Sequence, residues 1–466
     1  MGAGTAQGGA CLLISGKVRK NMEFVVFAGV LLLLFIFMIV QELIQTKNQE
    51  KLFKKYLREN YGKEPPKEYS LERFARLGSY LERHKEEKQL DDITWNDLGM
   101  DEVFRRIDRT YSAAGEEYLY YTLRNISCGR EALEHLEEVV NWLQEQENIK
   151  VRIQLLMKRL GHLGKYSLYD YLDNLDYLGE RSNRKIVLGN LLYLPFLLLL
   201  FVQPAMGTIG IVLCMLWHIM TYFREKKVIE PYIISFAYVL RLIDVCEELE
   251  KQKIPVYRRE LDELREALKS LRELRRGAYW VMAGNQGKIG GNPLDILADY
   301  LRMILHLDIF QFNRMLEKLR KKTGQVETML AITGYLDMAI SVGGFRKSLE
   351  GYCIPKLEED TEKAFLHMKK GWHPLLSQPV KNSIRADRGI LLTGSNASGK
   401  STFLKMVAVN AVLAQTIHTC AAESYHAPIF QIFSSMALRD SMENGESYYI
   451  VEIRSLKRIL DAAGEW

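Results

Sequence analysis

The sequence of residues 389–402, GILLTGSNASGKST, constrains the fold more than any other part of this chain. It has the G-x-x-x-x-G-K-[ST] spacing of a phosphate-binding loop, with an apolar run before it and a helix-forming run after it. In such loops glycines turn backbone N–H groups around the phosphates, and the helix N-terminus adds its positive dipole end. We therefore expect a buried strand at 390–392, a helix at 403–413 and a bound nucleoside triphosphate. A glycine-rich turn that matches by chance is the alternative.

The residue types in the loop fit the chemistry of ATP and Mg²⁺. Lys400 supplies a positive charge for the β- and γ-phosphates, and the Ser401 hydroxyl is placed to ligate Mg²⁺. The nucleotide-binding residues that we predict make up the whole loop: Gly394, Ser395, Asn396, Ala397, Ser398, Gly399, Lys400, Ser401 and Thr402.

The length and composition of the chain limit the remaining possibilities. With 466 residues the chain is too long for one domain, and about three units are expected. A net charge of +5 with 26% charged residues is too weakly basic to argue for nucleic acid. The six cysteines form no C-x-x-C pair, which excludes a zinc ribbon and a disulfide scaffold and fits a reducing compartment.

Two apolar regions predict membrane spans. Residues 24–41 follow a tail at 1–23 and lack a small-residue cleavage site after them, so a membrane anchor is favoured over a signal peptide. Residues 186–223 are too long for one span and are interrupted at 203–207, which predicts a transmembrane helical hairpin. A hairpin buried in a soluble core is the alternative, although core helices seldom run so far without a charge.

Basic residues border these spans on one side. They follow the first span at 47–58 and flank the hairpin at 181–185 and 224–227, whereas the hairpin turn carries no charge. By the positive-inside rule, we expect a multi-pass membrane protein whose soluble domains lie in the cytoplasm.

The soluble regions at 42–185 and 224–365 are predicted to be helical domains. Two amphipathic helices are expected within 99–124, joined around 112–115. The most basic cluster, 314–322, is a candidate nucleic-acid patch, but it has no interleaved aromatic residues. Apolar residues at helical spacing indicate two core faces: Leu133, Leu136, Val139, Val140 and Leu143, and Leu261, Leu264, Leu268 and Leu271.

Three further short segments accompany the loop: GWHPLL at 371–376 before it, and CAAES at 420–424 and DSMENGESYYIVE at 440–452 after it. Together with the loop, they resemble the MutS family of DNA mismatch-repair ATPases. The family carries an R-H-P segment, a G-P-N-M-x-G-K-S-T loop, a P-A-E turn and a D-D-L-x-x-G-x-S-T-F-x-x-E-M stretch in the same order. The resemblance also covers about 95–160.

The resemblance implies a fold, cofactors and partners. We expect a multi-domain protein with transmembrane helices, an all-α core and lever region, and an α/β P-loop NTPase domain of the ABC-type, MutS-like class at 366–466. The cofactors would be ATP and Mg²⁺. The protein would form a homodimer in which Ser447 of one subunit contacts the nucleotide bound by the other. DNA is the ligand that the family implies, although membrane sequence stands where its mismatch-reading domain would be.

The sequence also departs from the family pattern. Trp372 stands in place of an arginine, Ala397 in place of the loop methionine and Tyr448 in place of a threonine. Residues 403–466 follow the loop, whereas a P-loop sheet covered by helices needs about a hundred residues or more. We therefore expect the chain to stop before Walker B, the strand whose carboxylate reaches Mg²⁺. No catalytic residue is predicted, and the chain is a fragment of an ATPase or does not hydrolyse ATP.

Two other functions fit parts of the sequence. A membrane transport or remodelling ATPase would use the loop to drive the spans, but the spans lack polar residues that could line a path and no LSGGQ signature occurs. A nucleotide-binding scaffold without turnover fits the missing Walker B strand.

Overall fold

The computed structural model of this protein describes most of the chain between residues 37 and 463. The described residues are 37, 40–41, 44–64, 69–86, 89–126, 129–164, 166–275, 300–359, 364–395, 398–436 and 448–463. The chain divides into two compact units, residues 1–61 and 62–466, which we describe separately.

The described part of the first unit is helical. Residues 44–60 form a helix with mostly exposed side chains. Two ion pairs lie along it, and each joins residues one helical turn apart: Lys54–Glu50 at 2.6 Å and Lys55–Glu59 at 3.7 Å. The predicted anchor at 24–41 lies outside the described residues except at positions 37, 40 and 41, which are helical, so the anchor stays a prediction.

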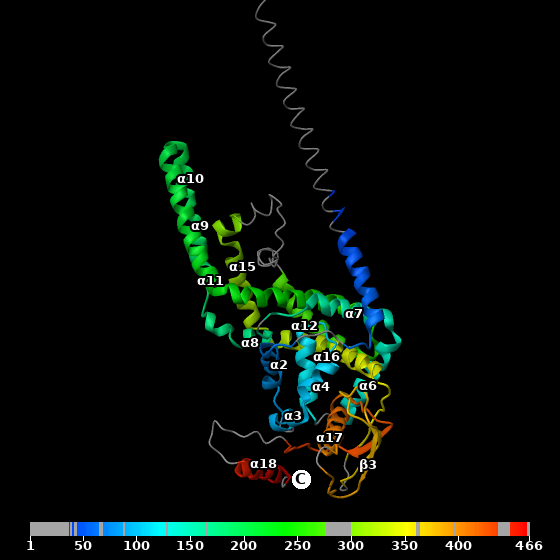
Figure 1. Cartoon of the computed structure of the whole chain (residues 1–466). Coiled ribbons are helices and arrows are strands. Elements are labelled where there is room, and N and C mark those ends of the chain that lie inside the picture. The colour runs from blue at the N-terminus through cyan, green and yellow to red at the C-terminus, as the bar shows by residue number, and fades with distance from the viewer. Residues whose placement is uncertain are drawn as a thin grey trace, which may run out of the picture. The chain divides into compact units, whose positions relative to one another are not determined.

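The second unit is mostly helical and carries one small mixed sheet (Figure 1). The expected combination of helical regions with a sheet near the C-terminus is confirmed, whereas an α/β P-loop NTPase fold stays a prediction. The α-helices are α2 (Leu71–Arg83), α3 (Asp92–Leu98), α4 (Met100–Ile107), α5 (Ala113–Arg124), α6 (Arg130–Glu145), α7 (Glu147–Leu160), α8 (Leu168–Asp173), α9 (Arg184–Leu191), α10 (Tyr193–Val202), α11 (Pro204–Glu250), α12 (Arg258–Leu271), α15 (Leu307–Arg320), α16 (Thr323–Ser348), α17 (Lys400–Ile417) and α18 (Tyr448–Ala463). Short 3-10 helices lie at Leu175–Leu178, Pro255–Tyr257 and Arg272–Arg275.

The core of the second unit lies between α5 and α16, and α16 also packs against α6, α7 and α12. Gly334 lets α16 approach α5 closely, because a Cβ at this position would lie 2.6 Å from the Ala114 carbonyl oxygen. Asp337 on α16 accepts hydrogen bonds from Tyr111 N at 3.0 Å, Ser112 N at 2.9 Å and Ser112 Oγ at 2.6 Å. A negative charge at a helix N-terminus is favourable, so Asp337 fixes the start of α5.

The helices predicted from periodicity are present. Helices α4 and α5 are the two helices expected in 99–124, joined at 108–112 rather than at 112–115, and the Ser112 hydroxyl caps α5 by accepting from Gly115 N at 3.0 Å. Helix α4 is amphipathic, whereas α5 is buried on almost all sides, so the amphipathic pattern expected for α5 is wrong. The predicted core faces of α6 and α12 are buried. Helix α12 packs against α16 and α11, which supply the partner helices that its leucine spacing requires.

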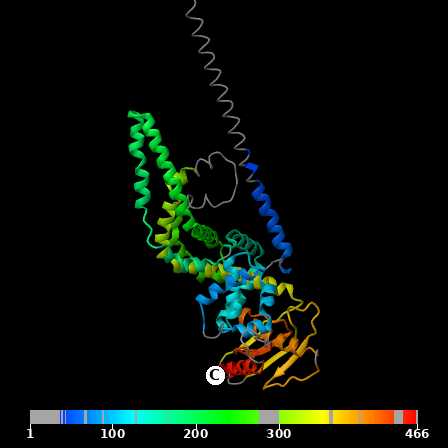
Figure 2. The same cartoon turned by 60° about the vertical axis from the view of Figure 1, so that its left-hand side comes forward.

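The hairpin predicted at 186–223 is present as two helical arms. Helices α9 and α10 form one arm and the first half of α11 forms the other, with the turn at Gln203, and the arms run side by side in both views (Figures 1 and 2). Large apolar side chains on the arms are exposed, among them Leu198, Phe201, Leu213 and Met220. The second half of α11 is instead buried in the helical core.

Three helices in the described part of the chain are long and apolar enough to cross a membrane: Arg184–Val202, Pro204–Glu250 and Thr323–Ser348. The most apolar stretches of the first two are only 6% and 28% buried, whereas that of the third is 83% buried inside the protein. Helix α16 is therefore a core helix, and the two hairpin arms are the candidates for membrane spans.

The sheet has the strand order β1-β4-β2-β3. Its strands are β1 (Lys356–Glu358), β2 (Leu366–Gly371), β3 (Asn382–Ala386) and β4 (Ser424–Pro428). Strands β1 and β4 are parallel, and β2 is antiparallel to both β3 and β4. Helix α17 packs against β2 and also against α5 and α6, so it lies between the sheet and the helical core.

The strand predicted at 390–392 is wrong. Ile390, Leu391 and Leu392 belong to no strand and are 54%, 88% and 37% exposed. A strand needs a neighbour to pair its N–H and C=O groups, and within the described ranges no strand lies beside this segment. The helix predicted at 403–413 is confirmed and is longer than expected, since α17 begins at Lys400 and ends at Ile417.

Candidate functional site

The predicted phosphate-binding loop leads directly into α17. Gly399 is the N-cap of this helix and has a φ of 86°, a left-handed conformation that glycine adopts without strain. Lys400 is the first helical residue, and its Nζ donates to Gly394 O at 2.7 Å and Ser395 O at 2.5 Å and lies 3.4 Å from Ser398 Oγ. The lysine ammonium thus lies at the centre of the loop, next to the N-terminus of α17.

This arrangement can bind an anion. The first turn of a helix has unpaired N–H groups and the positive end of the helix dipole, and Lys400 adds a full charge beside them. Ser401 and Thr402 lie exposed in this first turn, where their hydroxyls are accessible to a ligand or a metal ion. The predicted residues Asn396, Ala397 and Ser447 lie outside the described residues, so their predicted roles stay predictions.

Asn410, in the middle of α17, joins two of the sequence motifs. Its Nδ2 donates to Trp372 O at 3.0 Å and its Oδ1 accepts from Ala421 N at 2.7 Å. Trp372 N also donates to Ala421 O at 2.9 Å. The GWHPLL segment and the CAAES turn, which are far apart in the sequence, are therefore held together on the helix that carries the loop.

Gln415 lies about one and a half turns further along α17. It joins the helix to the segment after α5 and to the segment after β4. Its Nε2 donates to Ile126 O at 3.1 Å and to Phe430 O at 2.8 Å, and its Oε1 accepts from Phe430 N at 3.1 Å. Neither Asn410 nor Gln415 is among the residues predicted from the sequence. The available signal was that two amide side chains stand in an otherwise apolar helix, where a buried polar group requires hydrogen-bond partners.

Arg346 of α16 lies at the C-terminal end of α17 and is almost completely buried. Its guanidinium donates to Thr419 Oγ1 at 2.8 Å, to His418 O at 3.0 Å and to both carboxylate oxygens of Glu137 on α6 at 3.0 and 2.7 Å. A cation at a helix C-terminus is favourable because it faces the negative end of the helix dipole. One side chain therefore connects α6, α16 and the far end of α17.

The charge of Glu137 is stabilised by this cluster. Partial burial by itself would raise the pKa of Glu137, but hydrogen bonds from His418 and Arg346 outweigh burial and lower the pKa to about 2. The carboxylate is therefore ionised throughout the physiological range. The sequence offered no signal for this cluster, because Glu137, Arg346 and Thr419 are separated by many residues.

A second connection links the chain after β4 to α3. Ser434 Oγ donates to Asp97 Oδ2 at 2.7 Å, Met436 N donates to the same oxygen at 2.8 Å, and Ser434 N donates to Thr94 Oγ1 at 3.1 Å. Arg458 of α18 donates to Ser434 O at 2.6 Å. The chain after the loop thus contacts the helical core at two separate places, at the end of α17 and around Ser434.

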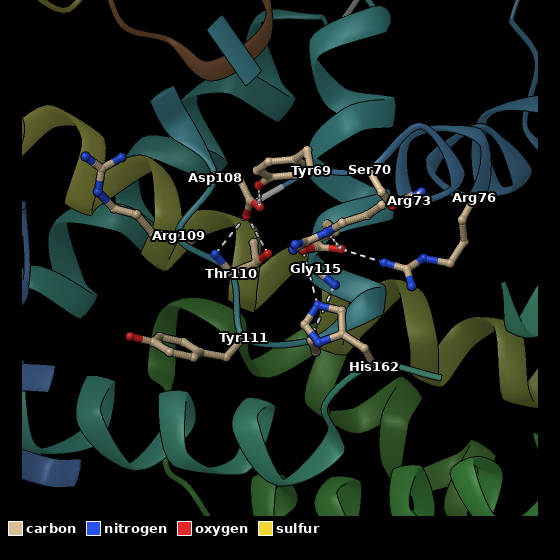
Figure 3. A network of polar contacts seen from close by, with 12 residues as sticks. Tyr69, Ser70, Arg73, Arg76, Asp108, Arg109, Thr110, Tyr111, Gly115 and His162 are labelled. Carbon is tan, nitrogen blue, oxygen red and sulfur yellow. Dashed lines mark hydrogen bonds and ion pairs between the residues drawn. The ribbon is translucent and has the colours of Figure 1, made fainter. Parts of the chain in front are cut away.

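The helical core itself contains a buried carboxylate with basic side chains around it (Figure 3). Glu116 on α5 is fully buried and accepts from Arg73 and, at 2.9 Å, from Arg76, both on α2. His162 Nε2 lies 3.1 Å from a Glu116 carboxylate oxygen. Figure 3 shows Arg73 and Arg76 extending from one helix and His162 from a different segment of the chain. Because the charges compensate one another, we interpret this network as the means by which α2 is held on α5.

The basic cluster at 314–322 does not form a free cationic surface. Arg320 donates to Leu175 O at 2.6 Å and to Gly179 O at 3.0 Å, and Lys318 pairs with Glu273 at 2.9 Å. Lys322 donates to Ser270 O. These contacts use much of the positive charge to attach α15 to its neighbours, so a nucleic-acid patch at 314–322 gains no support.

Comparison with known proteins shows that the loop and the residues after it are similar to one protein family. Residues 390–466 match the family model of MutS domain V. The chain is similar to proteins named DNA mismatch repair protein MutS: 30% identical over 171 residues to that of Leptospira interrogans (serovar copenhageni), covering 34% of this chain and 20% of the relative. It is 31% identical over 166 residues to that of Pelotomaculum thermopropionicum (33% and 19%) and 28% identical over 162 residues to that of Pseudothermotoga lettingae (33% and 20%). The chain thus spans about a fifth of the length of these curated relatives.

Proposed function

We propose that this chain, which belongs to the MutS family, binds ATP with Mg²⁺, dimerises when it does so and acts on DNA from a membrane anchor. Family membership supports a function related to DNA mismatch repair. One observation supports the proposal that nucleotide binding acts on the rest of the protein: Lys400 and Arg346 lie at opposite ends of one helix, α17.

ATP would be held by the loop and the first turn of α17. Lys400 now donates to neutral carbonyl oxygens of the loop, and the β- and γ-phosphates offer charged acceptors with which an ammonium forms stronger hydrogen bonds. We expect Lys400 to leave Gly394 O and Ser395 O and to bind the phosphates. The Ser401 hydroxyl would ligate Mg²⁺, and the N–H groups of the loop would surround the phosphates.

Helix α17 would carry the state of the loop to the helical core. With 18 residues it is about 27 Å long, and its C-terminal end is tied by Arg346 to α16 and α6. A displacement of the loop end on binding a nucleotide is then transmitted by a rigid element rather than by flexible chain. Asp97 on α3 gives a second contact through which the segment after β4 acts on the core.

The remaining parts of the proposal concern partners and location. In the dimer, Ser447 of one subunit would contact the nucleotide bound by the other, and closure of the dimer would act on DNA through the helical core. The hairpin of α9, α10 and α11 and the segment at 24–41 would span the membrane and hold the soluble part in the cytoplasm. The exposed apolar arms of the hairpin support this placement, because apolar surface of this extent is unfavourable in water.

The nucleotide-binding proposal is tested by Lys400→Ala. The variant loses a charge-assisted contact of about 1.5–3 kcal/mol, so we expect its affinity for a fluorescent ATP analogue with Mg²⁺ to fall by about 10- to 150-fold. The measurement is fluorescence anisotropy on the purified full chain in detergent. Lys457→Ala, which removes an exposed lysine from α18, is the matched control and should bind as wild type does. Equal affinity of the Lys400 variant and wild type would show that the loop does not bind the nucleotide.

A further inference from the structure

Two of the cysteines lie directly opposite each other. Cys353 lies between α16 and β1, and Cys420 follows the C-terminal end of α17. The two residues form an antiparallel bridge in which Cys353 N donates to Cys420 O at 2.9 Å and Cys420 N donates to Cys353 O at 3.0 Å. The Cα atoms of such a hydrogen-bonded pair are about 5.5 Å apart, within the range of about 4.4–6.8 Å that a disulfide can bridge.

The two thiols have different environments. Cys420 is fully buried and its Sγ lies 3.5 Å from Asn410 O, whereas Cys353 is partly exposed. A hydrogen bond from the Cys420 thiol lowers the pKa of Cys353, against an opposing effect of burial. Burial, together with the same hydrogen bond, raises the pKa of Cys420 well above its ordinary value. Cys353 is therefore the thiol that an oxidant reaches, and it is the one that ionises more readily.

We propose that Cys353 and Cys420 are a redox modification site that a peroxide oxidises reversibly to a disulfide. Cys353 is the nucleophile and Cys420 is the resolving thiol. The disulfide links the chain that enters the sheet to the chain that leaves α17, directly beside the cluster at the end of that helix. This site does not depend on the function proposed above.

The reaction proceeds in two displacements. The Cys353 thiolate attacks one oxygen of hydrogen peroxide, the O–O bond breaks, and the second oxygen leaves as hydroxide that takes up the proton released by the thiol. The sulfenic acid on Cys353 is then attacked by the Cys420 sulfur, the S–O bond breaks, and the second water leaves with the Cys420 proton. In total two thiols lose two electrons and peroxide is reduced to two waters.

The position of the pair favours reversibility. Cys353 is partly exposed, so a thiol reductant can reach a disulfide formed there. Exposed disulfides are more easily reduced than buried structural ones, which suits a regulatory disulfide in a reducing compartment.

The test is to identify by mass spectrometry which cysteines of the full chain in detergent form a disulfide. Wild type is treated with hydrogen peroxide, remaining thiols are blocked with N-ethylmaleimide, and unreduced peptides are identified by mass spectrometry. We expect a peptide pair joined through Cys353 and Cys420, which disappears after dithiothreitol and is absent from Cys353→Ser. In Cys420→Ser we expect a sulfenic acid on Cys353 that is trapped by dimedone. Cys246→Ser, at a buried cysteine in the second half of α11, should leave the joined pair unchanged.

Several results would overturn the proposal. It fails if peroxide leaves Cys353 and Cys420 as free thiols while other thiols oxidise, or if it converts Cys353 to a sulfinic acid in wild type without a joined peptide. A Cys420 variant that does not fold leaves the decision to the results for wild type and Cys353→Ser. Cys353 should also react with maleimide at least about tenfold faster than Cys246, because it is partly exposed and ionises more readily.

Discussion

At the residue scale, Arg346 offers the most direct test of how the helical core is connected to the loop helix. Arg346→Met removes a buried charge and leaves the Glu137 carboxylate without the side chain that donates to both of its oxygens. Because breaking a buried ion pair leaves an uncompensated charge, we expect the free energy of unfolding to fall by about 3 kcal/mol. The measurement is denaturant unfolding of the full chain in detergent.

Two further variants serve as a control and as a test of the cause. Arg314→Met removes an exposed arginine from α15 and should change the free energy of unfolding by less than about 0.5 kcal/mol. Adding Glu137→Gln to Arg346→Met should recover part of the loss, since no buried charge is then left alone. If Arg346→Met is as stable as wild type, the cluster does not hold α17 on the core.

A second residue-scale prediction concerns Glu117, which is buried in the helical core and accepts a hydrogen bond from Ser167 Oγ at 2.9 Å. Burial raises its pKa from an ordinary value of 4.5 to about 8, although Ser167 and Arg76 oppose this shift. Between these two pH values the folded state binds more protons at Glu117 than the unfolded state. Its contribution to the free energy of unfolding therefore falls as pH rises from about 4.5 to about 8.

The test for Glu117 is the pH dependence of thermal unfolding. Glu117→Gln cannot ionise, so the difference in unfolding temperature between the variant and wild type should shift in favour of the variant from pH 5 to pH 8. Glu131→Gln, at an exposed position on α6, should follow wild type at every pH. Parallel curves for Glu117→Gln and wild type would mean that Glu117 is not protonated in the folded state at neutral pH.

At the element scale, the hairpin of α9, α10 and α11 makes a prediction about topology. Its arms are apolar and exposed, its turn at Gln203 is uncharged, and basic residues flank it at 181–185 and 224–227. If the arms span the membrane, the flanks stay inside and the turn lies outside. A cysteine introduced as Gln203→Cys should then react with a membrane-impermeant maleimide added to intact cells.

The control for the hairpin is Lys457→Cys on α18, which should react only after the cells are lysed, and the parent chain gives the background from its own cysteines. Labelling of Lys457→Cys in intact cells together with protection of Gln203→Cys would reverse the topology. Protection of both positions until lysis would place the turn inside and exclude two spans.

At the scale of the whole molecule, dimerisation is tested at Ser447. The family resemblance implies that its hydroxyl meets the γ-phosphate held by the other subunit. Ser447→Ala should therefore leave ATP binding by one subunit nearly unchanged, because its own loop makes most contacts. It should weaken ATP-driven dimerisation, since a hydrogen bond to a charged group is worth about 1.5–3 kcal/mol and each dimer has two such sites.

The measurement is sedimentation of the full chain in detergent with a non-hydrolysable ATP analogue. Ser377→Ala, at an exposed position before the loop, is the matched control and should dimerise as wild type does. If Ser447→Ala dimerises as tightly as wild type, the residue does not contact the nucleotide of the other subunit.

The sequence alone determined the features that depend on near neighbours along the chain. The core faces of α6 and α12, the helix after the loop and the two-armed hairpin all follow from the spacing of apolar residues and from a break near Gln203. These patterns act within a few turns of helix, so they can be recognised without knowing the rest of the structure.

Only the tertiary structure decided the features whose partners are distant in the sequence. Residues 390–392 have the composition of a strand but form none, because pairing depends on what lies alongside. Helix α16 is apolar enough for a membrane span but is covered by other helices. The contacts of Arg346 with Glu137 and Thr419, and the Cys353–Cys420 bridge, join segments separated by 67 to 209 residues. No local pattern specifies such pairs, since they form only when the fold brings their segments together.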